Sequence, residues 1–179
     1  HWAPTPDPPE GGWQIESGPL ESEANTDSAF CLFGSFPEGP DLAVNHYSFH
    51  QHPNLGHHLN FYLHDEEDTP PEGVAVPCEL GAMNGGQLVF EGNTVAEDGS
   101  GGAMILPEGM AVHIDGGQKF YIESHYVNYT DDKQTFHDYV NIGFMEYDAV
   151  ETWVTSFTNA EGDLDIPPQQ ESVTIIDCV

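Results

Sequence analysis

The chain has 179 residues, a usual length for one domain, and its 38% hydrophobic content is enough for a folded core rather than a disordered acidic tail. Its 31 acidic residues face only Lys119 and Lys133, so the net charge is −29. This charge excludes nucleic acid as a partner and disfavours anionic lipid surfaces. No apolar run approaches the roughly 20 residues of a membrane-spanning helix, so we predict no membrane span.

Residues 1–12 are rich in proline and predict an extended N-terminal arm. Proline removes backbone donors and restricts φ, which makes a central strand improbable there. Such an arm could pack on a second copy of the chain, so self-association through it is one expectation. Residues 13–179 carry no sign of a linker or repeat and are predicted to form a single domain.

Short runs of alternating apolar and polar residues follow the arm, separated by turns rich in Gly and Pro. Within 119–128, Ile122 falls on one strand face, and Glu123 and His125 fall on the other. This pattern predicts an all-β fold, an antiparallel jelly-roll β-sandwich of about 8–10 strands. Segment 65–102 is predicted to be a long loop or weak hairpin. Strands are expected near 13–17, 28–36, 42–51, 57–64, 103–107, 110–114, 119–128, 135–147, 151–158 and 171–178.

Six of the ten histidines lie between residues 46 and 64. Neutral imidazole is a common ligand for copper and zinc, so the cluster indicates a metal site. His57 and His58 are adjacent, and neighbouring side chains of a regular strand point to opposite faces. Both can bind one ion only where the backbone is irregular, and Gly56 immediately before the pair favours such an irregularity.

Two further sets of residues are weaker ligand candidates. His50 and His52 would share one face of a strand, and an N-terminal His1 could chelate copper through its amine and ring, as in lytic polysaccharide monooxygenases. Calcium is a second candidate ion, attracted by the acidic surface, and Asp163-Leu-Asp165 could contribute to its binding although no complete calcium loop is present.

Several pieces of the sequence occur in a characteristic order: Cys31-Leu-Phe, His57-His58-Leu59, Leu106-Pro-Glu-Gly-Met110, Gly116-Gly117 and Glu123-Ser-His125-Tyr126. In this order they resemble the copper type II, ascorbate-dependent monooxygenases, the family of peptidylglycine α-hydroxylating and dopamine β-monooxygenases. The similarity covers about residues 13–179. Its most specific part is the histidine pair followed by the distal His-Tyr.

The resemblance implies a jelly-roll domain that holds one copper ion per chain through His57, His58 and His125. Family members activate oxygen at a second copper in a second domain, and this sequence ends at Val179, where that domain would begin. We therefore predict a domain for copper binding, storage or electron relay, served by a redox partner or a small-molecule reductant. The alternatives are a copper- and ascorbate-dependent monooxygenase, mononuclear or completed by a partner, whose catalytic residues are unknown, and a structural subunit of an extracellular assembly or filament.

Three cysteines are compatible with an oxidising compartment. The resemblance implies a disulfide between Cys31 and Cys78, although a Cys31–Cys178 pairing stays open; otherwise Cys178 is free or links to another chain. The proline-rich start at His1 fits a mature secreted, extracellular or periplasmic protein whose leader has been removed. Asn128-Tyr-Thr130 adds a glycosylation acceptor pattern.

Overall fold

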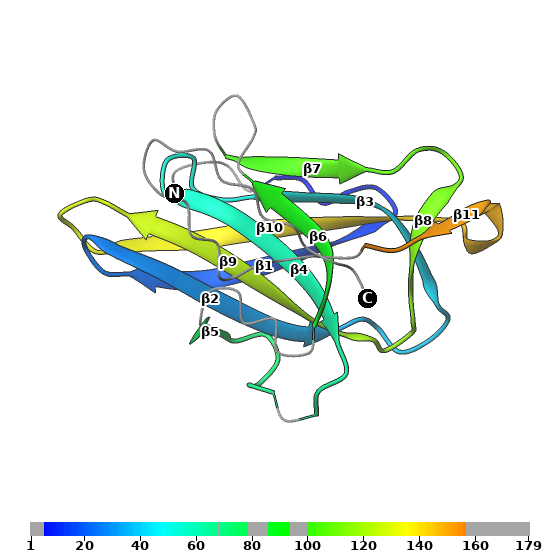
Figure 1. Ribbon diagram of the computed structural model, residues 1–179, viewed down its shortest axis with the longest axis horizontal. Coiled ribbons are helices and arrows are strands. Elements are labelled where there is room, and N and C mark those ends of the chain that lie inside the picture. The colour runs from blue at the N-terminus through cyan, green and yellow to red at the C-terminus, as the bar shows by residue number, and fades with distance from the viewer. Residues whose placement is uncertain (1–5, 68, 79–85, 94–99, 157–179) are drawn as a thin grey trace, which may run out of the picture.

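The computed structural model describes residues 6–67, 69–78, 86–93 and 100–156, which form two β-sheets (Figure 1). The predicted all-β sandwich is confirmed, whereas its jelly-roll connectivity stays a prediction. One short 3-10 helix, Tyr147–Ala149, accompanies the strands. The strands are β1 (Gly12–Ser22), β2 (Thr26–Ser35), β3 (Leu42–His50), β4 (Gly56–His64), β5 (Ala75–Cys78), β6 (Gln87–Asn93), β7 (Gly101–Ile105), β8 (Met110–Ile114), β9 (Lys119–Asn128), β10 (Gln134–Met145) and β11 (Thr152–Val154).

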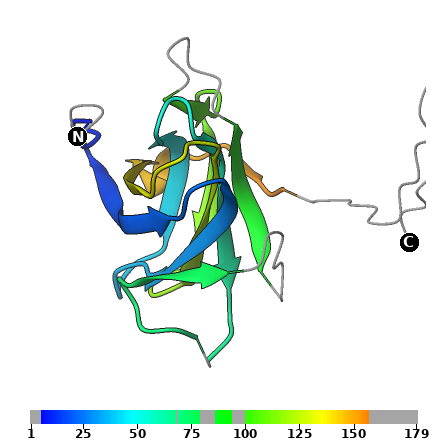
Figure 2. The same ribbon diagram turned by 90° about the vertical axis from the view of Figure 1, so that its left-hand side faces the viewer.

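The two sheets differ in strand order. The six-stranded sheet runs β1-β10-β3-β8-β11, with β7 also paired to β3, and the five-stranded sheet runs β5-β2-β9-β4-β6. The pairing of β11 with β8 is parallel, and the other pairings are antiparallel. In Figure 1, β2, β9 and β4 lie side by side, and β4 begins near the end where β9 finishes; Figure 2 views the molecule from that end. This end carries His57, His58 and His125.

Alternation along the strands fills the space between the sheets. Phe120 and Ile122 of β9 and Val140 and Ile142 of β10 are buried in one large apolar cluster. Trp13, at the start of β1, adds its ring to this cluster and lies 5.8 Å from the ring of Phe120. Burial of these aromatic and branched side chains supplies the main driving force for folding.

The prediction for segment 65–102 is wrong. It contributes β5, β6 and the start of β7, and β6 pairs with β4 while it buries Val89 and Phe90. A register shift between Phe61 and Tyr62 interrupts this pairing. The apolar run in β6 is short and flanked by glycines, and pairing with β4 stabilises it as a strand.

The remaining strand predictions differ from the structure mainly at their ends. The strand expected over 151–158 is Thr152–Val154, and the one expected over 42–51 ends at His50. The strand expected near 171–178 lies outside the described residues. In the described part of the arm, the carbonyl of Pro6 accepts a hydrogen bond from Gln14 Nε2 at 2.9 Å, so this part contacts its own chain.

The Cys31–Cys78 disulfide is confirmed and joins β2 to β5. Cys178 lies outside the described residues. Within the described ranges, no helix is long and apolar enough to cross a membrane.

A buried acid lies between the sheets beside the apolar core. Asp138 of β10 is fully buried and accepts a short hydrogen bond from the hydroxyl of Tyr126. Burial raises the pKa of Asp138 to about 7, although the polar side chains of Ser124, Tyr126 and Gln51 favour its charged form. The chain therefore holds a carboxyl group that titrates near neutral pH.

Asp138 should make the protein lose stability as the pH rises from about 4 to 7. Its pKa is about 7 in the folded state against a reference value of 3.8, so the folded state binds the proton more tightly. The stabilisation is complete below the unfolded pKa and is lost as the pH approaches the folded pKa, which amounts to about 4 kcal/mol. When the free energy of unfolding is measured with denaturant at several pH values, Asp138→Asn should lack this loss of stability. The variant of an exposed residue, Asp131→Asn, should keep it. An unchanged pH dependence in Asp138→Asn would contradict the assignment.

Loss of the disulfide should lower stability through the unfolded chain. The bond links residues 47 apart in sequence. In the chain-entropy model, opening such a loop costs about 4 kcal/mol of unfolding free energy. We expect the double variant Cys31→Ser/Cys78→Ser to unfold at a markedly lower urea concentration than the oxidised wild type. A midpoint equal to that of the oxidised wild type would show that the cross-link does not limit stability.

Candidate metal centre

The two adjacent histidines lie at a β-bulge in β4. Gly56 pairs with Tyr126 and His58 pairs with His125, so β4 has one residue more than β9 at this point, His57. This confirms that the backbone is irregular at the pair, as sequence reasoning required. A bulge redirects side chains, and here it lets neighbouring residues approach the same partner.

Gly56 shapes the entry to this bulge. Its nitrogen donates to the carbonyl of His52 at 2.9 Å, and the turn before β4 also places the carbonyl of Leu55 2.9 Å from the nitrogen of Val127. A Cβ atom at Gly56 would lie 2.7 Å from Cβ of Gln51 and 3.0 Å from the carbonyl oxygen of His52. Only glycine fits there without a shift of the backbone.

The three predicted ligands come together. Ring centroids lie 5.2 Å apart for His57 and His58, 4.9 Å for His57 and His125, and 4.7 Å for His58 and His125. Each ring offers one nitrogen, and these nitrogens lie within 4.8 Å of one another. His57 is exposed, His58 is half-buried and His125 is buried, so the group opens to solvent on one side.

The nitrogens that face the centre can be named for two of the rings. Nδ1 of His58 lies 3.3 Å from Nδ1 of His125. Two ligand atoms about 2.0 Å from one ion at a tetrahedral angle are separated by about 3.3 Å. The observed spacing therefore fits a shared metal ion without a movement of these two rings.

The outer nitrogens of the same two rings face carboxylates. Nε2 of His125 lies 2.6 Å from Oδ1 of Asp27, a hydrogen-bond distance. Nε2 of His58 lies 3.6 Å from Oε1 of Glu123, an ion-pair distance. A carboxylate on the outer nitrogen holds an imidazole with its other nitrogen toward a metal, and metal-binding histidines usually have such a partner.

The surroundings of His57 favour its neutral form. Partial burial lowers its pKa, and the nearby rings of His125 and His58 lower it further, whereas Asp27 acts in the opposite direction. A neutral imidazole is the form that binds metal.

Asp27 and Glu123 were not predicted as partners of the histidines. A signal for Glu123 was present, because it lies two residues before His125 and therefore on the same strand face. Asp27 gave no local signal, since it reaches His125 from another strand, β2.

The secondary ligand candidates do not join this centre. His50 ends β3 in the other sheet and His52 lies in the following turn, so the prediction that they share one strand face is wrong. Neither belongs to either group of converging metal-binding side chains found among the described residues. His1 and the calcium candidates Asp163 and Asp165 lie outside those residues.

A second group of converging side chains was not predicted. Nε2 of His113 lies 3.3 Å from Oδ2 of Asp41 and 3.5 Å from Oδ1 of Asp115. All three residues are exposed, and rings of Tyr147 and Trp153 flank the imidazole. Exposed ion pairs of this kind are common on acidic surfaces and contribute little to stability.

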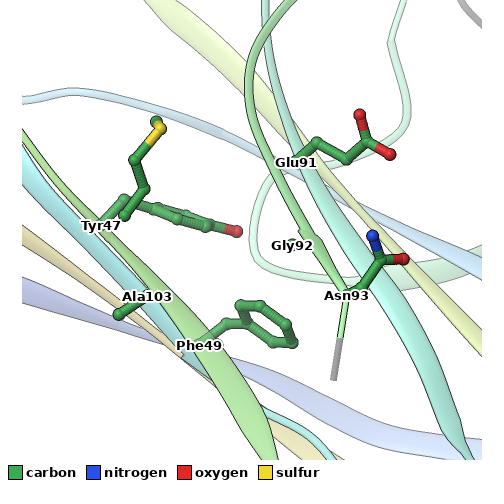
Figure 3. A pocket seen from close by; sticks show the side chains of 8 residues that line it. Tyr47, Phe49, Glu91, Gly92, Asn93 and Ala103 are labelled. Carbon is green, nitrogen blue, oxygen red and sulfur yellow. The ribbon is translucent and has the colours of Figure 1, made fainter. Parts of the chain in front are cut away.

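A separate pocket opens where β3, β6 and β7 approach (Figure 3). Figure 3 shows the Tyr47 hydroxyl directed toward Gly92, with Asn93 and Phe49 nearby. This hydroxyl is buried without a hydrogen-bond partner among the described residues, and burial raises the pKa of Tyr47 well above its usual value. The pocket therefore presents a protonated phenol, and none of the three clustered histidines lines it.

The side chain of Asn128, the acceptor residue of the glycosylation pattern, is engaged in hydrogen bonds within the fold. Asn128 is buried, and its Nδ2 donates to carbonyls of Ser22, Glu23 and Asp132. Its Oδ1 accepts hydrogen bonds from the backbone and side chain of Thr130. In the folded protein this amide closes the turn after β9 and is not accessible for modification.

Comparison with known proteins adds no assignment. The sequence matches no protein-family model and no curated protein. The three-histidine group therefore stands on its geometry alone.

Substitution of Gly56 should disturb the centre more than the fold. Gly56→Ala brings a methyl group too close to Gln51 and His52 and must shift the bulge that orients His57 and His58. Overpacking of this kind costs about 1–3 kcal/mol of unfolding free energy. We expect thermal unfolding at a lower temperature and weaker metal binding in a chelator competition. Wild-type affinity in a folded Gly56→Ala variant would contradict the role of this glycine.

Proposed function

We propose that this protein is a copper-binding domain that holds one copper ion through His57, His58 and His125. The observation that carries the proposal is the 3.3 Å approach of Nδ1 of His58 and Nδ1 of His125, with a carboxylate facing the outer nitrogen of each ring. Without a metal the two nitrogens lie at hydrogen-bond distance from each other, and the same separation fits two ligand atoms of one shared ion.

Copper is preferred to zinc on chemical grounds. Imidazole ligands suit both ions, but Cu²⁺ stands above Zn²⁺ in the general order of affinity for such sites. The sequence resemblance to the copper type II, ascorbate-dependent monooxygenases supports the same ion. The disulfide is compatible with an oxidising compartment, such as the extracellular space or the periplasm, in which we place the protein.

Each protein group would have a defined part in the centre. His58 and His125 would bind through Nδ1, and the more exposed His57 would complete the set from the bulge. Asp27 would keep the imidazole of His125 oriented from its outer nitrogen. A bound copper ion would supply one-electron chemistry, which suits storage or relay of copper or electrons with a redox partner or small-molecule reductant.

A copper- and ascorbate-dependent monooxygenase is the second candidate, because three protein ligands leave a coordination position for an exogenous ligand. Ascorbate-dependent oxygen consumption coupled to hydroxylation of an added substrate would support it. Membership of an extracellular assembly or filament stays a prediction, since it concerns the arm and Cys178.

Removal of one ligand should abolish tight copper binding. Metal analysis of protein purified without a tag should find one copper per chain, and His125→Ala should weaken binding by more than the roughly 10- to 100-fold typical of changes behind the ligands. His137→Ala is the matched control, because His137 lies half-buried beside Glu16 and belongs to neither group of converging metal-binding side chains among the described residues. Tight copper binding by His125→Ala would contradict the site, and a preference for zinc over copper would contradict the metal.

A further inference from the structure

Glu123 is an unusual residue beside the candidate centre. Its side chain is only 1% exposed although it lies on the outer face of β9, between Cys31 of β2 and Asn60 of β4. Oε1 accepts a hydrogen bond from Nδ2 of Asn60 at 3.2 Å. Oε2 is buried and has no hydrogen-bond partner in the described part of the chain.

No lysine balances this buried carboxylate. Nζ of Lys119 donates to the carbonyl of Glu66, and Lys133 forms ion pairs with Glu21 and Glu23. The chain's two basic residues are thus engaged elsewhere. The group that can become positively charged and does approach Glu123 is the imidazole of His58, whose Nε2 lies 3.6 Å from Oε1 of Glu123. A buried carboxylate without a counter-charge is unfavourable, so a cation next to His58 would be stabilised by it.

We propose that Glu123 determines the charge specificity of the metal centre, making it prefer a divalent ion to a monovalent one and therefore Cu²⁺ to Cu⁺. This inference rests on the proposed function, namely that His57, His58 and His125 hold a metal. Coulomb attraction is proportional to the charge of the ion, and it is strong where water is excluded. Glu123 therefore contributes twice as much free energy to the binding of Cu²⁺ as to that of Cu⁺.

Asp27 differs from Glu123 in its exposure. It is closer to its histidine, with 2.6 Å between Oδ1 and Nε2 of His125, but its side chain is 58% exposed. Solvent screens an exposed charge, so Asp27 acts mainly on the orientation of His125. The orientation of the ring affects the binding of Cu²⁺ and Cu⁺ alike. A change in the ratio of the two affinities therefore distinguishes the role of Glu123 from that of Asp27.

The test compares Cu²⁺ and Cu⁺ affinities of the wild type and Glu123→Gln in chelator competitions. Glutamine keeps the shape of the side chain and can accept the hydrogen bond from Asn60. We expect Cu²⁺ binding to weaken by roughly 10- to 100-fold. Because the free-energy effect is halved for Cu⁺, its binding should weaken by about the square root of that factor, roughly 3- to 10-fold. The ratio of Cu²⁺ affinity to Cu⁺ affinity then falls about 3- to 10-fold, and the reduction potential of the bound copper rises by about 30–60 mV.

Two variants serve as controls. Glu91→Gln makes the same substitution in the next strand, where Glu91 pairs with Asn60 but is exposed, and it should leave the affinity ratio unchanged. Glu123→Asp keeps the charge and should keep a ratio near that of the wild type. Metal-free Glu123→Gln should melt at the same temperature as the wild type or higher, since it removes an uncompensated charge.

The outcomes separate this proposal from the one on which it rests. Equal weakening of Cu²⁺ and Cu⁺ binding, or no weakening, would overturn the role of Glu123 and leave the three-histidine site intact. An equal change of ratio in Glu91→Gln would overturn it as well. Absence of copper binding in the wild type would overturn both proposals. If Glu123→Gln does not fold, Glu123→Met, which has similar length and no hydrogen-bonding requirement, carries the same comparison.

Discussion

The candidate centre depends on one extra residue in β4. Without the bulge at His57, the pleat would direct His57 and His58 to opposite faces of the sheet, and one of them would enter the core. With it, both rings approach His125 on the outer face. Gly56 makes the bulge sterically accessible, since its backbone lies against Gln51 and the carbonyl of His52. A local irregularity of the backbone thus decides whether the histidine pair can act as a pair.

The regular part of the same sheet arranges the surroundings of the centre in successive rows. Past the bulge at His57, strands β2, β9, β4 and β6 place residues in rows across the outer face, although the register between β4 and β6 shifts once, between Phe61 and Tyr62. A histidine row is followed by a row with the buried carboxylate and then by an aromatic row. The rows are Ala29, His125, His58 and Asn93; Cys31, Glu123, Asn60 and Glu91; Phe33, Tyr121, Tyr62 and Leu88.

These rows explain how a carboxylate can be buried on an outer sheet face. Tyr62 and Tyr121 stack with ring centroids 4.5 Å apart and cover one side of the Glu123 row. Burial raises the pKa of Tyr62 to about 12, and the charge of Glu123 contributes to this shift. The disulfide at Cys31 belongs to the same apolar cluster as the two tyrosines. Aromatic cover and cross-link together keep water from the carboxylate that faces His58.

The sequence by itself determined the all-β class, because alternation with period two is a local property that the strand pleat imposes. It also pointed to the three histidines, through residue type and the resemblance, and to the Cys31–Cys78 bond through the resemblance. It failed for β5 and β6, where the decisive contacts are made with β2 and β4. It likewise suggested a joint role for His50 and His52 that their positions do not support.

Only the tertiary structure decided which carboxylates lie beside the histidines. Asp27, Glu123 and Asn60 come from β2, β9 and β4, and their mutual positions follow from strand register. The segment Gly56-His57-His58 indicated an irregular backbone, but register also depends on the partner strand and on the packing of the buried faces, which cannot be read from a single segment. The sequence pointed to the three candidate ligands because metal chemistry restricts residue type and because their order resembles that of a known family. Their geometry and electrostatic setting were left to long-range pairing, because contacts between strands far apart in the chain leave no periodic trace in the sequence.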